Sequence, residues 1–424
     1  MKMKTIIITL VLSIATFAQI KFDDYFIDRS LRIDYYHTAD SANDWYSMGE
    51  LKEEPYWGGT KTKLTEGFNY GSFIFKAYDD STNRLIYYHT YSSLLNEWQT
   101  TDEAKHTTRT FYETVTMPFP KHKIRVEFYT RNREHVPIKK FVYKIDPKSY
   151  FIEQDNNYRY PTFKVHYSGD PAVKVDIVIL PDGYTKDQLG KFKKDCKRFA
   201  GYLFETSPYD KNVDKFNIWG VEAASQDSGT DIPGEGIWRN TLLNTSFYTF
   251  DEARYCLTSD DKTVRDLAAN APYDQIYILV NSDRYGGGGL YNFYTVCTTD
   301  NKNSNFVFTH EFGHGFAYLG DEYYTSSVAY SNFFPTDVEP LEPNLTTLVD
   351  FKSKWKNMVA DTIPIPTPAT PEYKNVVGVF EGGGYVAKGV YRPAEVCSMD
   401  QVVFNHFCPV CKAAIQKMID YYTK

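Results

Sequence analysis

Short segments in which apolar and polar residues alternate fill the first part of the chain. They are rich in Tyr, Phe, Ile and Val, and turn-prone clusters such as residues 79–83 and 118–120 separate them. Alternation with a period of two is typical of half-buried strands, which favour aromatic and β-branched side chains. The segments cover residues 30–38, 72–80, 84–92, 109–117, 122–131 and 138–146. Short strands at this spacing predict an all-β sandwich.

The pattern changes after a polar passage with Tyr and Pro at residues 156–171, which we interpret as a domain junction. Residues 173–180, VKVDIVIL, form a continuous apolar run, as expected of a strand that is buried on both faces. A helix is predicted at residues 189–205, and further strands at residues 215–223 and 273–281. Strands that alternate with helices indicate an α/β or α+β layer. The predicted fold class is therefore α+β, with an all-β sandwich followed by an α/β domain.

The N-terminus has the order of a secretory signal peptide. Two lysines precede an apolar run at residues 5–14, and small residues follow up to Ala18. The run is too short for a comfortable membrane span, no Cys stands at the cleavage position to take a lipid anchor, and no later run is apolar enough to cross a membrane. We expect a signal peptide at residues 1–18, a β-sandwich domain at 19–160 and a second domain at 161–424, in a secreted, periplasmic or cell-surface protein.

The second domain contains an H-E-x-x-H motif in the stretch THEFGHGFAYLGDEY, residues 309–323. Residues four apart in a helix lie about one turn above each other, so His310 and His314 can direct their imidazoles at a single zinc ion. Glu311 is then left beside the metal. An apolar stripe on the opposite side supports the helix, because phenylalanines recur at a spacing of four. They are Phe308, Phe312 and Phe316.

A catalytic zinc takes three protein ligands and keeps a fourth position for water. The candidates for the third ligand are Asp321, Glu322, Glu395 and His406. In an unbroken helix Asp321 would lie roughly 10 Å along the axis beyond His314, which is too far for a shared ion. Asp321 can therefore bind only if the helix ends and the chain turns back, for which Gly315 and Gly320 have suitable backbone freedom. Asp321 is the leading candidate, and Glu322 is its main rival.

The composition adds two observations, the number of cysteines and the high content of aromatic residues. In an exported chain six cysteines invite pairing, although the sequence leaves the connectivity open: Cys196, Cys256, Cys297, Cys397, Cys408 and Cys411. Cys408 and Cys411 have the spacing of a redox site but lack its βαβ surroundings, so we favour a structural disulfide, with Cys397 as one candidate partner. The 36 Tyr and 29 Phe suit half-buried strands.

Two further segments flank the motif. Four consecutive glycines at residues 286–289 lack the order of a dinucleotide-binding loop. They are interpreted as a closely approached edge beside the cleft, with a solvated loop as the alternative. The chain ends in a predicted amphipathic helix at residues 411–422, whose role is packing.

The motif region resembles the secreted bacterial IgA-peptidase-type family of zinc metallopeptidases. The likeness rests on HEFGHGFAYLGDEY together with CSM at residues 397–399 and FCPVC at residues 407–411. NYGSFIFKAYDD and SSLLNEWQTTDEA, residues 92–104, resemble the N-terminal β domain of the same family. The likeness covers most of the mature chain.

The resemblance implies a metzincin-like catalytic domain, in which a third ligand follows a turn after the motif and a methionine-containing turn underlies the metal. By position it makes His310, His314 and Asp321 the zinc ligands, Glu311 the general base and Met399 the methionine beneath the site. Where the family motif usually has Gly, four residues after the second histidine, this chain has Tyr318. The turn is then expected at Gly315 or Gly320.

These observations predict a secreted zinc-dependent endopeptidase, in which zinc lowers the pKa of a bound water and Glu311 accepts its proton. The expected partner is a protein or peptide substrate, with host glycoproteins among the candidates. The net charge of −7 and the lack of a basic block argue against nucleic acid. Nothing in the sequence specifies an oligomeric state, and immunoglobulin A is not assigned as substrate, because fold and chemistry do not determine it.

Three alternatives stay open. They are a zinc hydrolase of a non-protein substrate, a non-enzymatic surface protein that binds glycans or proteins, and a thiol-disulfide exchanger at Cys408 and Cys411. The intact motif argues against the second, because a purely structural metal site has no use for Glu311.

Overall fold

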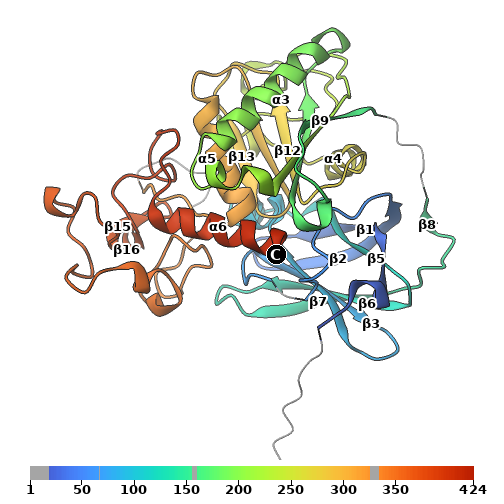
Figure 1. The fold of residues 1–424 in the computed structure, drawn as a ribbon, viewed down its shortest axis with the longest axis horizontal. Helices are drawn as coiled ribbons and strands as arrows, with labels where there is room; N and C mark the ends of the chain where they lie inside the picture. Colours follow the sequence, from blue (N-terminus) through green and yellow to red (C-terminus); the bar gives the residue numbers. More distant parts are fainter. Residues whose placement is uncertain (1–18, 66, 155–159, 325–333) are drawn as a thin grey trace, which may run out of the picture.

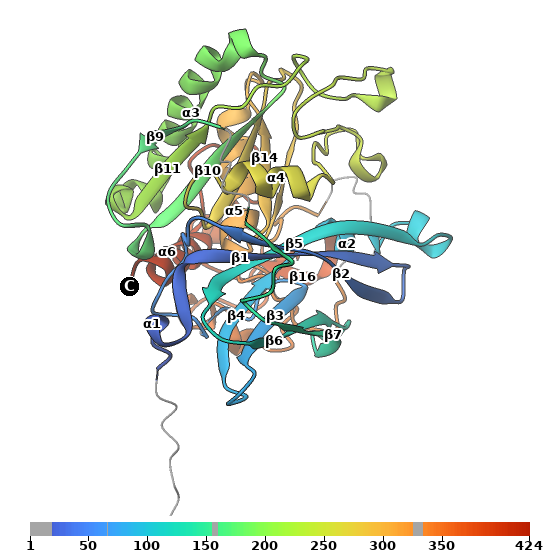
Figure 2. The same cartoon turned by 90° about the vertical axis from the view of Figure 1, so that its right-hand side faces the viewer.

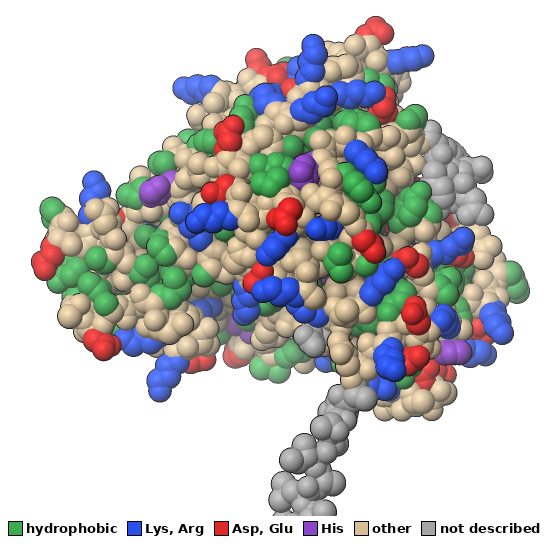
Figure 3. Space-filling view, in the orientation of Figure 1, with side chains coloured by type: hydrophobic (Ala, Val, Ile, Leu, Met, Phe, Trp, Pro, Cys, Tyr) green, Lys and Arg blue, Asp and Glu red, His purple; other side chains and the backbone are tan. Residues whose placement is uncertain are grey.

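The computed structural model describes residues 19–65, 67–154, 160–324 and 334–424. The predicted signal peptide and residues 156–159 of the predicted junction lie outside the described residues. Within the described part of the chain, no helix combines the length and apolar character needed to cross a membrane. On the face shown in Figure 3, acidic and basic side chains are interspersed.

The N-terminal region is built from two four-stranded sheets (Figure 1). One has the order β5-β1-β2-β8, with β1 (Phe26–Ala39), β2 (Asp44–Glu54), β5 (Arg109–Pro120) and β8 (Ile152–Glu153). The other has the order β4-β3-β6-β7, with β3 (Phe73–Asp79), β4 (Leu85–Tyr91), β6 (Ile124–Arg131) and β7 (Pro137–Ile145). The sheets meet through aromatic side chains such as Tyr35 of β1 and Phe128 of β6, whose ring centroids are 4.9 Å apart. All six predicted strands are confirmed, whereas β2, β8 and the short helices α1 (Phe22–Tyr25) and α2 (Leu94–Trp98) were not predicted.

A mixed six-stranded sheet forms the centre of the second region, in the order β13-β14-β12-β10-β11-β9. Its strands are β9 (Thr162–His166), β10 (Val175–Asp182), β11 (Phe216–Val221), β12 (Gln275–Val280), β13 (Gly287–Leu290) and β14 (Tyr294–Thr298). The four inner strands are parallel, and the edge strands β9 and β13 are antiparallel to their neighbours. The predicted strands are confirmed as β10, β11 and β12. One interpretation needs correction, because β9 lies within the supposed junction. Of the two interpretations of the glycine run, the closely approached edge is confirmed and the solvated loop is wrong, because Gly287–Leu290 form the edge strand β13.

Helices cover the two faces of this sheet differently (Figures 1 and 2). On one face lie α3 (Leu189–Phe204), α5 (Ser304–Ala317) and α6 (Pro409–Thr423), and on the other α4 (Asp261–Ala268) packs against both β10 and β5. Side chains of β10 alternate accordingly. Ile177 and Ile179 join the core of the helical face, whereas Val178 and Leu180 join a core that continues into the N-terminal sheets. The two regions therefore share a core, and the arrangement is α+β.

Most of the remaining described chain is irregular. Between α5 and α6 it contains the hairpin of β15 (Phe380–Gly383) and β16 (Val386–Arg392). Short 3₁₀ turns occur at Glu103–Lys105, Pro171–Val173, Lys186–Gln188, Tyr209–Lys211, Val213–Lys215, Pro233–Glu235, Thr249–Asp251, Phe351–Ser353, Lys356–Met358 and Pro371–Tyr373.

A buried arginine joins the two regions electrostatically. The Arg32 side chain of β1 is fully buried, and its guanidinium donates to Asp34 at 2.9 Å and to Asp266 of α4 at 2.7 Å. A third carboxylate, Glu54 of β2, lies 3.4 Å away and also accepts a hydrogen bond from Tyr273 at 3.2 Å. Because buried charges are tolerated only when they are paired, this cluster links β1 and β2 to α4.

We expect Arg32→Met to lower the free energy of unfolding by about 3–5 kcal/mol, since it leaves buried carboxylates without their cation. Chemical denaturation followed by circular dichroism measures the change. Lys105→Ala, which breaks an exposed pair with Asp102, is the control and should leave the midpoint nearly unchanged. Equal midpoints for the two variants would contradict the role given to Arg32.

Candidate metal centre

Helix α5 presents the H-E-x-x-H motif at its C-terminal half. His310 and His314 lie one turn apart on the side that lines a pocket, with Glu311 between them in the sequence. The opposite side is buried against α3 and the sheet, where Tyr277 of β12 stacks on Phe308 with ring centroids 4.3 Å apart. The predicted helix and its buried aromatic stripe are both confirmed, and the stripe consists of Phe308, Phe312 and Phe316.

The chain turns back at Tyr318. This residue caps α5 in the left-handed conformation, with φ 54° and ψ 35°, and its N–H donates to the carbonyl of His314 at 3.1 Å. A left-handed conformation is unfavourable by roughly 1–2 kcal/mol for a residue other than glycine. Ring contacts hold Tyr318 in place: its centroid lies 5.5 Å from that of Tyr70 and 4.9 Å from that of Tyr291.

The prediction that Gly315 or Gly320 makes this turn is wrong. Gly315 is helical, and a Cβ there would lie 2.2 Å from Thr295 Oγ1, so its glycine permits close packing of α5 on β14. A Cβ on Gly320 would lie 2.6 Å from Leu345 Cδ1. At both positions a Cβ would crowd a neighbouring side chain, so the glycines serve close packing. The reversal itself depends on aromatic contacts between residues that lie far apart in the sequence.

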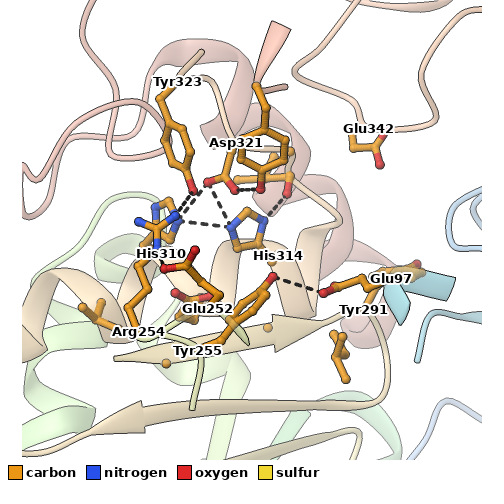
Figure 4. Close-up of a pocket in the computed structure, with 18 of the residues that line it drawn as sticks. Glu97, Glu252, Arg254, Tyr255, Tyr291, His310, His314, Asp321, Tyr323 and Glu342 are labelled. Atoms are coloured by element: carbon orange, nitrogen blue, oxygen red, sulfur yellow. Dashed lines mark hydrogen bonds and ion pairs between the residues drawn. The ribbon is translucent and has the colours of Figure 1, made fainter. Parts of the chain in front are cut away.

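The turn brings three potential ligands together (Figure 4). Nε2 of His310 lies 3.1 Å from Nε2 of His314, and Asp321 Oδ1 lies 3.1 Å from the first and 3.3 Å from the second. The other nitrogen of each imidazole faces a backbone carbonyl. Nδ1 of His310 lies 2.7 Å from Ser398 O, and Nδ1 of His314 contacts Leu319 O. Donation from Nδ1 leaves the Nε2 lone pairs free to bind a metal.

These spacings fit a metal ion. Ligand atoms about 2.0–2.1 Å from a tetrahedral zinc lie about 3.3 Å from one another, close to the observed separations. Among the described residues, Asp321 Oδ1 is also buried and accepts no hydrogen bond, although buried polar atoms are nearly always satisfied. Two imidazole lone pairs and an unsatisfied carboxylate oxygen therefore face one point, which a cation would occupy favourably.

The β15–β16 hairpin fixes Asp321. Its tip consists of Gly384 and Tyr385, both with positive φ (56° and 65°), as in a tight two-residue turn. The N–H of Gly384 donates to the Asp321 carbonyl at 2.8 Å, and the hydroxyl of Tyr385 donates to Asp321 Oδ2. The N–H of Tyr385 donates to Tyr323 O at 3.0 Å. Asp321 is thus held by both its backbone and its carboxylate.

A second loop, which contains Ser398 and Met399, packs against α5 and supports the site. Met399 is fully buried, and a Cβ on Gly313 of α5 would lie 3.2 Å from its Sδ, which places the thioether directly against the metal helix. The preceding residue, Ser398, supplies the carbonyl that orients His310. The Met399 carbonyl accepts from the N–H of Glu322 at 2.7 Å. The loop therefore contacts the histidine helix and the segment that carries Asp321.

The other candidate ligands lie elsewhere. The carboxylate of Glu322 points away from the histidines and contacts Cys411 Sγ at 3.1 Å. His406 is exposed and Glu395 is half-buried, and neither joins the histidine cluster. All six cysteines are free thiols, so the expected structural disulfide is absent among the described residues, and the Sγ atoms of Cys397 and Cys411 lie 3.8 Å apart, beyond bonding distance.

A pocket of about 370 Å³ opens over the site. His310, Glu311, His314 and Asp321 line it, and so does the edge strand β13. A Cβ on Gly289 of β13 would lie 2.3 Å from the Glu311 carbonyl oxygen. The glycine run therefore lets the edge strand lie directly against the metal helix.

The N-terminal region contributes to the pocket wall, which the sequence did not predict. Glu97 of α2 lines the pocket and accepts a hydrogen bond from Tyr255 at 3.1 Å (Figure 4). Burial raises the pKa of Glu97 to about 7. Arg254 also lines the pocket, and one of its guanidinium nitrogens lies 3.4 Å from the hydroxyl of Tyr323. No local motif marks these residues, because each reaches the pocket through a loop or a short helix.

The buried acids and histidines of the site shift one another's pKa values. Burial raises the pKa of Glu311. Burial alone would lower the pKa of His314, but the Asp321 carboxylate outweighs it and raises that pKa to about 9. For Asp321 burial favours the neutral acid, yet the histidines outweigh it and hold its pKa well below the usual range. A proton and a metal ion therefore compete for the same imidazole.

Removing the Tyr385 hydroxyl tests the support of Asp321. We expect Tyr385→Phe to weaken metal binding about 10–100-fold, because groups that orient a ligand have effects of this size. Competition with a chromogenic chelator measures the affinity. Tyr391→Phe makes the same change on β16 of the same hairpin and should bind as tightly as the parent. If the two variants bind alike, the hydroxyl does not support the ligand.

Comparison with known families agrees with this arrangement. A family model described as IgA Peptidase M64 matches residues 163–374 and 369–419, and a model for the Peptidase M64 N-terminus matches residues 21–142. No curated protein matches the chain. The matched segments contain helix α5, Asp321 and the loop of Met399, and they cover most of the chain. The resemblance drawn from the sequence is confirmed: the chain belongs to the IgA peptidase M64 family and is therefore a peptidase, with a protein substrate.

Proposed function

We propose that the protein is a zinc-dependent endopeptidase. The observation that carries the proposal is the convergence of His310 Nε2, His314 Nε2 and Asp321 Oδ1 at tetrahedral spacing beside Glu311, in a pocket. Two nitrogens and one carboxylate oxygen are a ligand set of catalytic zinc sites, which keep a fourth position open. Zinc held by these residues would act as a Lewis acid that polarises a scissile carbonyl and makes water more acidic.

Glu311 is the proposed general base. Its carboxylate lies on the pocket side of α5, next in sequence to a ligand, and is not itself part of the ligand cluster. It would accept a proton from the attacking water and later donate it to the leaving amine. Its burial supports this role, because a carboxylate in a poorly solvated pocket holds a proton more readily than an exposed one.

We propose that the substrate binds as an extended peptide along β13. This strand is an edge of the mixed sheet, and Gly287, Gly289 and Leu290 line the pocket. Extended peptides commonly add to exposed edge strands through main-chain hydrogen bonds. Gly287 is buried and forms a β-bridge with Tyr255, whereas Gly289 is half-buried, so we expect the peptide to pair at the Gly289 end of the strand. The protein substrate itself is not assigned to immunoglobulin A.

The remaining features suit a metzincin-like catalytic domain at residues 161–424, after a β-sandwich domain at residues 19–160. The support is a third ligand beyond a turn and a buried methionine loop under the helix. We also propose export through the signal peptide at residues 1–18, on the sequence pattern alone. A thiol-disulfide exchanger is disfavoured, because Cys408 and Cys411 are only 3% and 0% exposed.

The rival functions are separated by one variant. We expect Glu311→Gln to keep its metal but to lower kcat for peptide cleavage by about 10²–10⁴, the usual contribution of a general base. The assay digests a peptide library with the purified residues 19–424 and maps cleavage sites by mass spectrometry, with metal content measured in parallel. Glu372→Gln, at an exposed position outside the pocket, should cleave like the parent.

Chelation provides the second readout. Removing the metal of the histidine site should abolish cleavage while circular dichroism shows that the protein stays folded, and adding zinc should restore cleavage. Full activity of Glu311→Gln with its metal in place would refute the mechanism. Absence of both metal and cleavage in the parent protein would favour a non-enzymatic binding protein, and hydrolysis of esters or glycans without peptide cleavage would favour another zinc hydrolase.

A further inference from the structure

A second cluster of metal-binding side chains lies behind the first. It consists of Glu322, Cys397, Cys408 and Cys411, and one potential ligand atom from each lies within 4.8 Å of all the others. All four side chains are buried, with Cys408 the most accessible at 3%. No atom of this cluster belongs to the histidine site, although Glu322 is next to Asp321 in the sequence.

The sulfur positions suit a thiolate-bound metal. The Sγ atoms of Cys397 and Cys411 lie 3.8 Å apart. Two thiolates about 2.3 Å from a tetrahedral zinc are separated by about 3.8 Å, whereas a disulfide requires about 2.05 Å. Glu322 Oε1 lies 3.1 Å from Cys411 Sγ, near enough for both atoms to share one ion.

The backbone around the sulfurs favours negative charge. The N–H of Cys408 points at Cys397 Sγ at 3.3 Å, and the N–H of Cys411 points at Cys408 Sγ at 3.5 Å. Cys408 is also the N-cap of α6, a helix of 15 residues, whose N-terminal end carries positive partial charge. These features lower the free energy of thiolates relative to thiols. A Cys-x-x-Cys pair at the start of a helix is likewise a common half of a zinc site.

Glu322 gives an independent indication of a cation. Its side chain is fully buried, and Asn344 donates to Oε1 at 2.9 Å. Oε2 is buried and has no hydrogen-bond donor among the described residues. Burying a carboxylate with an unsatisfied oxygen among sulfur atoms is unfavourable, unless a cation lies between them.

We propose that Cys397, Cys408, Cys411 and Glu322 bind a second metal ion, and that this ion is zinc. Three sulfur ligands select a thiophilic ion over Mg²⁺ or Ca²⁺. Four protein ligands complete a tetrahedral shell, so the site is closed and structural. Binding releases the protons of the three thiols to solvent, and no oxidation takes place.

Such an ion would stabilise the peptidase site indirectly. It joins the segment after Asp321, the loop of Ser398 and Met399, and the start of α6. Ser398 follows Cys397 and orients His310, while Glu322 follows Asp321 and donates its N–H to Met399 O. The second ion would therefore fix the spacing between the helix that bears the histidines and the loop that bears the carboxylate.

Counting metal in two backgrounds tests the proposal. Residues 19–424 are purified without chelator, and zinc per chain is measured by inductively coupled plasma mass spectrometry. We expect two zinc ions in the parent and one in His310→Ala/His314→Ala, which lacks the first site. Cobalt added to the metal-free double variant should give a thiolate-to-metal charge-transfer band. The second count does not depend on peptidase activity, so failure of the proposed function and failure of this proposal are distinguishable.

Two variants complete the design. Glu322→Gln keeps the shape of the side chain and should release zinc from the second site to a chelator about 10-fold faster or more, since weaker perturbations around metal ligands already have such effects. Cys196→Ala removes another buried thiol, on α3, and should still bind two ions. The proposal is overturned if the double histidine variant holds no metal, if cobalt gives no thiolate band, or if peptide mapping finds a disulfide among Cys397, Cys408 and Cys411.

Discussion

The reversal of the chain at Tyr318 is the constraint on which the candidate metal centre depends. Without it, Asp321 would continue along the helix axis, roughly 10 Å beyond His314. The reversal uses a conformation that is unfavourable for tyrosine, and the ring contacts with Tyr70 and Tyr291 offset this cost. Tyr70 belongs to the N-terminal region, so the ligand geometry of the second region depends on packing against the first.

Burial determines how the two adjacent acids are used. Asp321 faces two imidazoles and Glu322 faces three sulfur atoms, and each has one oxygen without a hydrogen-bond donor in the described chain. An isolated buried carboxylate is strongly unfavourable, so both positions make physical sense when cations are present. The Met399 loop lies between the two clusters and contacts both through its backbone.

Local pattern was enough to predict the parts whose structure is set by nearby residues. The alternating segments became strands, the four-residue spacing of phenylalanines became the buried face of α5, and the axial distance to Asp321 correctly required a turn. The prediction failed where residues far apart in the sequence determine the local structure. No sequence signal near Tyr318 predicts its left-handed conformation. Likewise, the residues near Glu97 and Tyr385 do not predict that α2 and the tip of the β15–β16 hairpin reach the pocket. The cysteines were expected to pair because sequence gives their number but not their separation.

The hairpin at Tyr385 and the loop at Ser398 have a consequence for how the protein matures. Both follow the histidines by more than 70 residues, yet they hold Asp321 and His310 in their binding orientation. During synthesis the H-E-x-x-H helix is completed long before these supports exist. A nascent or truncated chain would carry the histidines without a rigid third ligand, so competence to bind metal tightly arrives only with the last part of the chain. With the proposed function, the order of synthesis would therefore delay the appearance of an active peptidase until the chain that carries these supports has folded.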